Sequence, residues 1–292
     1  MRLGNAGMSA VYLALLRAVV SGRSADKRLF NDPYAIAFLT PSLKLVARLA
    51  RFTFLNRFIS WFIEKRWPGA LTSCEARTRL IDVMTINTVS DHGINQVIIL
   101  GAGFDCRAHR LQMRERVQFV EADHPLRQKI KREQLDALNL PQQPVDYIPM
   151  DFHTQQPEEV MPAMFRKQHY KTLFIWEGVT NFLTAPVGDG IFRYFRAFQP
   201  GTRIIFTYVD EKVLHNPGMF FGAASVTRLL KKHHEYWNFG LDPANITGFL
   251  AAYNMELLYD AGATEYRRMY FGEKAATMKG YEYYRVAMAV VR

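Results

Sequence analysis

Residues 96–107, QVIILGAGFDCR, and residues 117–125, VQFVEADHP, decide the fold of this chain. Each begins with a short apolar run containing β-branched residues, which predicts two buried strands. The first run ends at Gly101 and Gly103, where the missing Cβ atoms let the backbone turn tightly and approach a ligand. The second delivers Glu121 and Asp123 about 20 residues later, where an acid can accept hydrogen bonds from both hydroxyls of a ribose. Strand, glycine turn, helix, strand and acid together predict a nucleoside-binding unit.

The glycine spacing separates two kinds of nucleoside ligand. A dinucleotide fingerprint has a third glycine three residues after the second. This chain has Cys106 at that position, and Asp105 beside it would repel a pyrophosphate. The same carboxylate suits a ligand with an ammonium group and a cationic sulfur, such as S-adenosylmethionine. The pattern therefore favours S-adenosylmethionine over NAD, and it leaves open an α/β loop that binds nothing.

Ordered motifs along most of the chain resemble one family. They are RLFNDPYA (28–35), ARTRLID (76–82), LGAGFDCR (100–107), EADHP (121–125), WEG (176–178) leading into NFL (181–183), and FGLDP (239–243). The chain resembles the leucine carboxyl methyltransferase-like and polyketide O-methyltransferase-like branch of the S-adenosylmethionine-dependent methyltransferases. It departs from the family at Cys106, where threonine is usual, and at residues 180–182, where many members carry an apolar pair and tyrosine.

The resemblance implies an α/β fold: a Rossmann-like, seven-stranded class I methyltransferase sheet with an N-terminal helical cap. The pattern predicts strands at residues 97–100, 117–120, 146–149, 172–176, 203–209, 255–259 and 284–291. The resemblance makes the last of these antiparallel. We expect a single domain over residues 1–292, with the cap in residues 1–90 and the core in residues 91–292. Helices are predicted at residues 8–20 and 34–39.

Ligands of such sheets bind beyond the carboxyl ends of the strands. The residues at those ends that we predict to contact the methyl donor are Gly101, Ala102, Gly103, Asp123, His124, Asp151, Phe152, Glu177 and Gly178. The resemblance implies that Asp123 binds the ribose, Asp151 and Phe152 the adenine, and Glu177 with Gly101 the methionine end. Two structural alternatives remain: Asp151 could cap a helix near residues 154–158, and a neighbouring arginine could neutralise Glu177.

Two further donor contacts come from the N-terminal region. The resemblance implies that Arg77 clamps the donor carboxylate and that Lys27 lies near the same end. Arg77 and Arg79 lie two positions apart on a predicted helix, so their side chains point to different sides and only one is expected to enter the site. We choose Arg77.

The acceptor is expected to be a small molecule. Candidate contacts are Asn181, Phe182 and Tyr208, together with Arg107 and residues 236–237, while Tyr208 could instead be ordinary core. The family chemistry is in-line transfer to oxygen, and no residue of the sequence stands out as a general base. A carboxylate acceptor, already ionised near pH 7, is therefore favoured. The alternatives are a phenol or hydroxyl acceptor, an NAD-dependent oxidoreductase, and a binding protein without catalysis.

Composition narrows the class of protein. The chain has 292 residues, 49% of them hydrophobic, and a formal charge of +10, but its basic residues are spread along the sequence, so no nucleic-acid partner is expected. The densest basic cluster, in residues 127–132, is typical of a solvated helix face, with attraction of an anionic substrate or acidic carrier protein as the alternative. Two distant cysteines and eight scattered histidines predict neither a disulfide nor a metal site. With no leader or spanning segment, a cytoplasmic location is expected.

The segment at residues 43–67 mixes Leu, Phe, Ile and Trp with Lys and Arg at helical spacing, and it breaks at Pro68 and Gly69. Three interpretations are open. The segment could be a helical cap over the sheet whose aromatic residues help form the substrate pocket, a dimer face, or a peripheral membrane contact. The oligomeric state is not predicted.

Overall fold

The computed structural model describes residues 7–161, 163–166 and 169–292. Seven strands form one sheet in the order β3-β2-β1-β4-β5-β7-β6. They are β1 Gln96–Leu100, β2 Gln118–Asp123, β3 Val145–Pro149, β4 Thr172–Trp176, β5 Arg203–Val209, β6 Met255–Gly262 and β7 Tyr284–Val291. The pairings among β1 to β5 are parallel, and β7 is antiparallel to both β5 and β6. The predicted fold class is therefore confirmed, including the orientation of the last strand.

The α-helices are α1 Met8–Ser21, α2 Pro41–Leu49, α3 Thr53–Arg66, α4 Ala70–His92, α5 Arg107–Arg110, α6 Pro125–Asp136, α7 Pro157–Val160, α8 Ala185–Arg196, α9 Lys212–His215, α10 Ala223–Lys232, α11 Ile246–Ala251 and α12 Ala263–Phe271. Short 3-10 helices are η2 Ala35–Phe38, η3 Ala163–Arg166, η4 Thr180–Phe182, η5 Pro217–Met219 and η6 Gly272–Thr277. The helix predicted at residues 34–39 is thus a 3-10 turn. No helix of the described residues is long and apolar enough to cross a bilayer.

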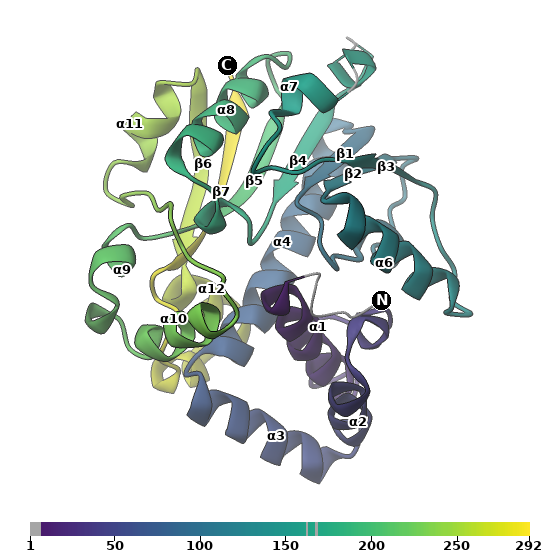
Figure 1. The fold of residues 1–292 in the computed structure, drawn as a ribbon, viewed down its shortest axis with the longest axis vertical. Helices are drawn as coiled ribbons and strands as arrows, with labels where there is room; N and C mark the ends of the chain where they lie inside the picture. Colours follow the sequence, from purple (N-terminus) through teal and green to yellow (C-terminus); the bar gives the residue numbers. More distant parts are fainter. Residues whose placement is uncertain (1–6, 162, 167–168) are drawn as a thin grey trace.

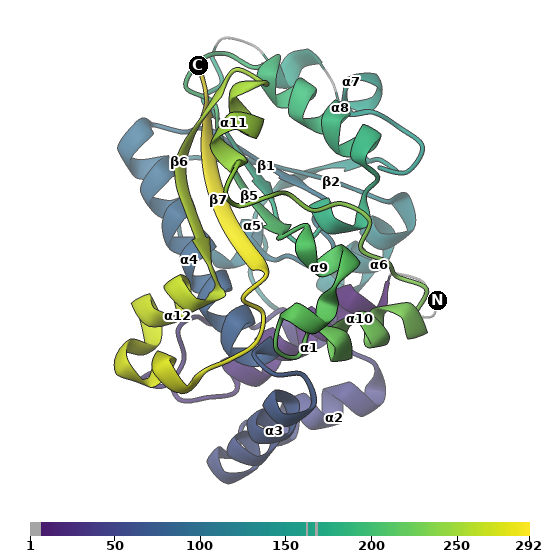
Figure 2. The ribbon, with the colours of Figure 1, turned by 90° about the vertical axis from the view of Figure 1, so that its left-hand side faces the viewer.

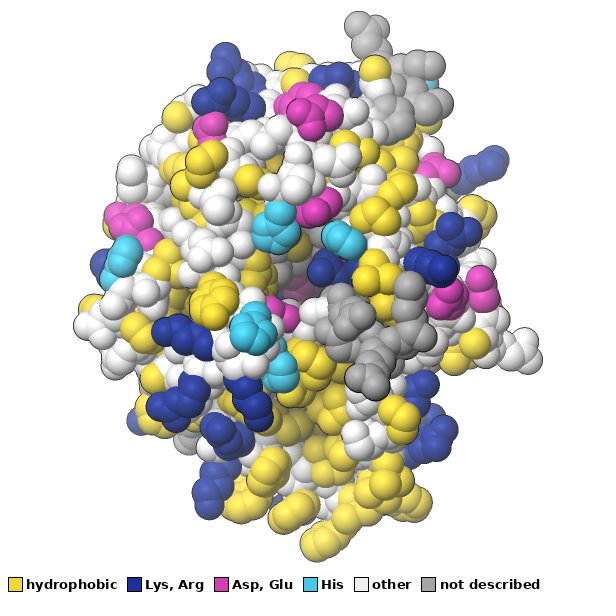
Figure 3. Space-filling model, viewed as in Figure 1, with side chains coloured by type: hydrophobic (Ala, Val, Ile, Leu, Met, Phe, Trp, Pro, Cys, Tyr) yellow, Lys and Arg dark blue, Asp and Glu magenta, His cyan; other side chains and the backbone are white. Residues whose placement is uncertain are grey.

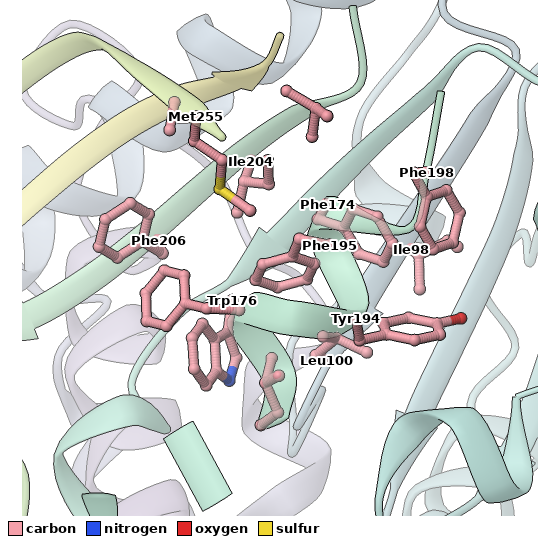
Figure 4. Packing of buried hydrophobic residues seen from close by; sticks show 14 of the residues in the cluster. Ile98, Leu100, Phe174, Trp176, Tyr194, Phe195, Phe198, Ile204, Phe206 and Met255 are labelled. Atoms are coloured by element: carbon pink, nitrogen blue, oxygen red, sulfur yellow. The ribbon is translucent and has the colours of Figure 1, made fainter. Parts of the chain in front are cut away.

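The central strands β1 and β4 are buried at every position and are apolar after their first residues, Gln96 and Thr172, so the sheet is covered on both faces. Alternate residues such as Phe174 and Trp176 point to one face, where they pack against Phe192 and Phe195 of α8 (Figure 4). The intervening residues pack on the other face, where α4 and α12 supply the cover. Helices on both sides hold the parallel strands in place, so their carboxyl ends form a fixed edge.

One further expectation about helices is corrected, and the structure locates the N-terminal helices. The helix predicted between the glycine turn and the second strand is only the four-residue α5, and residues 111–117 are irregular. The N-terminal helices α1, α2 and α3 lie beyond the carboxyl edge of the parallel strands rather than over a sheet face, and α2 and α3 form one end of the molecule (Figure 1 and Figure 2). Helix α4 connects these two parts, since it packs on α1 and α3 as well as on α12.

Candidate functional site

A cavity of about 560 Å³ lies at the carboxyl ends of β1, β2, β3 and β4, and α1 and α10 contribute to its walls. Figure 3 shows it as a hollow in the middle of the molecule, with acidic and basic side chains inside. Most of the predicted site residues line it: Arg77, Gly101, Ala102, Gly103, Asp123, His124, Asp151, Phe152, Glu177, Gly178, Asn181 and Phe182. The volume is within the range of small-molecule sites.

The glycine turn owes its shape to two different constraints. Both Gly101 and Gly103 have left-handed backbones, with φ of +63° and +51°. A Cβ on Gly101 would lie 2.3 Å from Cγ2 of Val179, whereas a Cβ on Gly103 would have no atom nearer than 3.8 Å. Gly101 is therefore required by the packing of the loop after β4 as well as by its own φ, which the sequence pattern did not indicate.

Asp123 is fixed at the end of β2 by a set of short hydrogen bonds. Its side chain is buried, and its Oδ2 accepts a hydrogen bond from the backbone N–H of Gly103. Its Oδ1 accepts from the His124 backbone N–H at 2.6 Å and from Nη1 of Arg127 at 2.6 Å. The carboxylate therefore ties the glycine turn to the end of the neighbouring strand and lines the cavity in a single orientation.

Glu177, at the end of β4, is held by two arginines. Its Oε1 lies 2.8 Å from Nε of Arg77, and its Oε2 lies 2.6 Å from Nη1 of Arg107. Burial alone would raise the pKa of Glu177, but Arg107 and then Arg77 outweigh burial, so the pKa lies below its ordinary value. The interpretation of Glu177 as a neutralised strand-end carboxylate is correct, and it also lines the cavity.

Arg107 joins Glu177 to a second group of buried charges. Its Nη1 lies 2.5 Å from Oδ2 of Asp105, and its Nε lies 2.8 Å from Oδ1 of Asp82. Arg110 contacts the other oxygen of Asp82 at 2.6 Å. Burial works to raise the pKa of Asp105, yet Arg107, Arg110 and Lys131 lower it well below its usual range. Asp105 is therefore not the uncompensated anion that the glycine pattern suggests.

The end of β3 presents Asp151 and the buried ring of Phe152 to the cavity. Oδ1 of Asp151 accepts from the backbone N–H of His153 at 2.9 Å. Helix α7 begins later, after the N-cap residue Gln156. Asp151 therefore does not cap that helix, and its carboxylate belongs to the cavity wall.

Two predicted contacts lie elsewhere. Lys27 is exposed on the turn after α1 and does not line the cavity. Tyr208 is fully buried on β5, where its hydroxyl donates to Oδ1 of Asp260 at 3.0 Å and accepts from Nε of Arg285 at 3.1 Å. Both predictions are contradicted by these positions. The turn at residues 24–27 faces solvent although the motif after it is largely buried, and the core interpretation of Tyr208 is the correct one.

The basic cluster of α6 is only partly a solvated face. Lys131 is buried with its Nζ 2.7 Å from Oε2 of Glu121, and Arg127 binds Asp123. Lys129 and Arg132 are exposed. Burial raises the pKa of Glu121 to about 7 even though Lys131 acts to lower it. Arg127 and Lys131 therefore hold the acids at the end of β2, and only the exposed Lys129 and Arg132 form a solvated face.

The sequence pattern missed two tyrosines of the cavity, Tyr281 and Tyr284, which precede and begin β7. Tyr281 has a left-handed backbone, with φ of +65°, next to Gly280, where a Cβ would meet the carbonyl oxygen of Pro68. Such strained backbones concentrate at functional sites. Burial raises the pKa of both phenols, so both stay protonated at neutral pH. A Gly-Tyr pair just before the last strand is the signal that could have pointed to them.

The wall away from the strand ends is apolar. Leu13 and Leu16 of α1, Trp67, Val226 of α10 and Trp237 contribute to it. Residues 236–237 and Arg107, also named as acceptor candidates, reach the cavity. Among the described residues, no group of His, Cys, Asp and Glu could hold a metal ion. The cavity thus joins a charged end to an apolar side.

A family model described as leucine carboxyl methyltransferase matches residues 10–195. A Mycobacteroides abscessus protein named "Putative S-adenosyl-L-methionine-dependent methyltransferase" is 47% identical over 62 residues, 21% of this chain and 20% of that protein. A Mycobacterium sp. MCS protein of the same name is 35% identical over 128 residues, 44% and 48% of the two chains. These alignments thus span about half or less of either relative.

The described fold is similar to that of solved structures with low sequence identity. A Thermobifida fusca protein described as "a putative methyltransferase" has a TM-score of 0.51 and 14% identity, covering 82% of this chain and 88% of that chain. A Streptomyces avermitilis protein of the duf574 family has a TM-score of 0.54 and 10% identity, covering 95% and 97%. At these identities the likeness shows the fold alone.

Proposed function

Because the chain belongs to the leucine carboxyl methyltransferase family, we propose that this methyltransferase transfers the methyl group of S-adenosylmethionine to a carboxylate of a small, largely apolar acceptor. One observation carries the proposal. The ends of four adjacent strands bring the glycine turn, Asp123, Asp151 and Glu177 together with Arg77 in one cavity. That cavity continues into an apolar wall that the donor-side residues do not use.

The donor end of the cavity fits S-adenosylmethionine. Asp123 would hold the ribose hydroxyls, Asp151 and Phe152 the adenine, and Arg77 the carboxylate. Only Nε of Arg77 is engaged by Glu177, and its Nη groups make no hydrogen bond within the described part of the chain. Arg77 therefore keeps a donor pair for a ligand. When bound, S-adenosylmethionine supplies a methyl group on a cationic sulfur, which an oxygen nucleophile can take.

A nicotinamide dinucleotide fits this site less well. Dinucleotide folds place the pyrophosphate at the N-terminus of a helix that follows the glycine turn. Here the turn leads into α5, which has only four residues, and Asp105 lies beside it. The short helix has little dipole to offer a phosphate. The carboxylate of Asp105 is already paired with Arg107, so the length of the helix is the feature that favours the methyl donor over NAD.

The acceptor end favours a carboxylic acid. The Tyr281 hydroxyl makes no hydrogen bond within residues 7–161, 163–166 and 169–292, and it remains a donor because burial keeps the phenol protonated. A protonated phenol can hold a carboxylate oxygen but cannot deprotonate an alcohol. A carboxylate acceptor needs only alignment and exclusion of water, which the apolar wall supplies. A phenol acceptor is the second candidate, and it would require a base.

The two cysteines, Cys74 and Cys106, are buried and unpaired with each other. Unpaired thiols are typical of proteins of a reducing compartment. The free thiols support a cytoplasmic location for the proposed activity.

Donor binding is tested with a matched pair of arginines on α4. Arg77→Gln should weaken S-adenosylmethionine binding, measured by calorimetry, by roughly 10- to 150-fold, because a charge-assisted hydrogen bond is lost. Arg79→Gln removes the same charge two residues away, outside the cavity lining, and should change binding little. Thermal melts establish that both variants are folded. Equal affinities in the two variants would exclude Arg77 from the donor site.

The acceptor class is tested by the chemistry of the product. A panel of apolar carboxylic acids and phenols is incubated with radiolabelled donor, and the labelled product is treated with mild alkali. A methyl ester releases volatile methanol, whereas a methyl ether keeps its label. Alkali-stable product would overturn the carboxylate proposal in favour of the phenol candidate.

A further inference from the structure

One side of α3 exposes large apolar side chains. The exposed fractions are 66% for Phe52, 80% for Phe54, 56% for Phe58, 54% for Trp61 and 53% for Phe62. We refer to these five residues as the α3 apolar face. A contiguous group of exposed aromatic residues is unusual on a protein surface and marks an interaction site. The cap interpretation of residues 43–67 is therefore wrong for these aromatic residues, which point away from the cavity wall.

The opposite side of α3 is anchored, so its outward face is fixed. Nδ2 of the buried Asn56 donates to the carbonyl oxygens of Val19 at 2.9 Å and Ala50 at 2.7 Å. Near the end of the helix, Glu64 accepts from the backbone N–H of Thr72 at 2.8 Å and also caps the start of α4. The helix cannot turn its aromatic residues inward without breaking these bonds.

The surroundings of the α3 apolar face are basic. Residues 41–67 contain six Lys and Arg residues and one acid, Glu64, which is committed to α4. Arg48, Arg51, Arg57, Lys65 and Arg66 are exposed. Figure 3 shows hydrophobic side chains running from below the hollow to the lower end of the molecule, with Lys and Arg side chains on both flanks. Lys65 Nζ lies 5.0 Å from the ring centroid of Trp61.

We propose that the α3 apolar face docks onto the surface of an anionic lipid bilayer. Phe and Trp on one side of a helix enter the boundary between headgroups and acyl chains, and flanking Lys and Arg bind anionic headgroups. A second copy of the chain is a poorer occupant. In a two-fold dimer the same patch meets itself, which would bring the basic flanks against each other.

The helix that carries the α3 apolar face also contributes to the cavity. Ile63 and Trp67, from the inner side and the end of α3, line the cavity. Just after α3, Pro68 lies beside Gly222, where a Cβ would be 3.1 Å from the Pro68 ring, and the neighbouring Phe221 is exposed. A docked molecule would therefore hold its apolar wall next to the acyl chains. The docking does not depend on methyl transfer, so the two are measured separately.

Vesicle co-sedimentation tests this proposal with the full chain. We expect binding to vesicles of equal phosphatidylcholine and phosphatidylglycerol, little binding to pure phosphatidylcholine, and loss of binding in high salt. Arg57→Glu/Lys65→Glu should lower the partition coefficient by about 25-fold or more, roughly fivefold for each of the two basic residues removed. The control Arg114→Glu/Arg116→Glu makes the same change of net charge in the loop before β2 and should bind normally.

The aromatic contribution is tested in the same assay. Phe54→Ser/Phe58→Ser should abolish vesicle binding, while Leu258→Ser/Met269→Ser, which alters exposed apolar residues of β6 and α12, should not. Brominated lipids should quench the exposed Trp61. Calorimetry with S-adenosylmethionine in solution shows whether each variant keeps its donor site.

Three results would overturn the proposal. They are no binding of the wild type to anionic vesicles at low salt, equal binding by the aromatic variant and its control, and sedimentation analysis showing a dimer that Phe54→Ser/Phe58→Ser dissociates. The last result would assign the face to a second copy.

Discussion

A single methyl group added at Gly101 tests how the glycine turn is built. Gly101→Ala places a Cβ in a left-handed residue and 2.3 Å from Cγ2 of Val179. Gly103→Ala places a Cβ in another left-handed residue, but the nearest atom is 3.8 Å away. The two variants therefore share the backbone strain and differ in the steric clash.

The expected free energies follow from that difference. A left-handed alanine costs about 1–2 kcal/mol, and forcing a methyl into a packed space costs about 1–3 kcal/mol more. Gly103→Ala should lower the free energy of unfolding by about 1–2 kcal/mol, and Gly101→Ala by about 2–5 kcal/mol. Val179→Ala removes both Cγ atoms and leaves a Cβ at 3.3 Å. The double variant should therefore be more stable than the sum of the single effects by about 1–3 kcal/mol.

Urea denaturation of the four variants and the wild type measures these values, with circular dichroism as the signal and unchanged m-values as the test of two-state behaviour. Calorimetric titration with S-adenosylmethionine on the folded variants then reports whether the displaced turn still faces the donor. Equal losses for Gly101→Ala and Gly103→Ala would refute the argument. So would additive effects of Gly101→Ala and Val179→Ala, because the clash would then not be with Val179.

Three other predictions concern buried polar groups. Arg107→Met should lower the free energy of unfolding by about 3–5 kcal/mol, and Glu177→Gln in the same chain should recover part of it in a urea double-mutant cycle. Burial, followed by the charge of Lys131, lowers the pKa of His109 to about 4, so this histidine contributes stability fully above about pH 6.5 that is lost as the pH falls toward 4. The loss is at most about 3 kcal/mol. In urea melts at several pH values, the free energy of unfolding of His109→Gln should therefore fall less steeply between pH 6.5 and 4 than that of the wild type. Tyr208→Phe should leave methyl-transfer rates unchanged and cost about 1 kcal/mol of stability in urea.

The strand ends could be predicted from the sequence because the signals are local. Apolar runs fix the strands, and parallel strands bring their carboxyl ends to one edge. This geometry is sufficient to predict that Asp123, Asp151 and Glu177 lie in one cavity, as the structure shows. The spacing of Arg77 and Arg79 on one helix also predicted that only one of them enters the cavity, and the family resemblance indicated Arg77.

The positions of the α6 basic residues and of Tyr208 could also have been predicted from the sequence, by applying the periodicity of a helix and of a strand. Arg127 and Lys131 are four residues apart, so they share a face of α6, and that face meets the acids of β2. Tyr208 lies on the same face of β5 as Phe206 and Ile204, which are core residues on one side of the sheet. Helix periodicity would have shown that Arg127 and Lys131 face the protein, and strand periodicity would have shown that Tyr208 is a core residue.

The remaining features depend on contacts between distant segments. Tyr281 reaches the cavity because Gly280 packs on the Pro68 carbonyl group, more than two hundred residues away in the chain. The aromatic residues of α3 resemble core in the sequence. The bonds of Asn56 and Glu64 and the burial of Ile63 determine which side of the helix faces the protein. The position of Tyr281 and the orientation of α3 therefore cannot be predicted from a local sequence pattern.

The doubly held Glu177 explains how a buried cation can remain available to a ligand. Removing one partner of a buried ion pair ordinarily leaves an uncompensated charge, which is strongly destabilising. Glu177 contacts Arg107 through one oxygen and Arg77 through the other, and Arg107 is itself held by Asp82 and Asp105. If Arg77 turns toward the carboxylate of a bound donor, Glu177 keeps its bond to Arg107. Arg77 can therefore bind a donor carboxylate without leaving the carboxylate of Glu177 without a cationic partner.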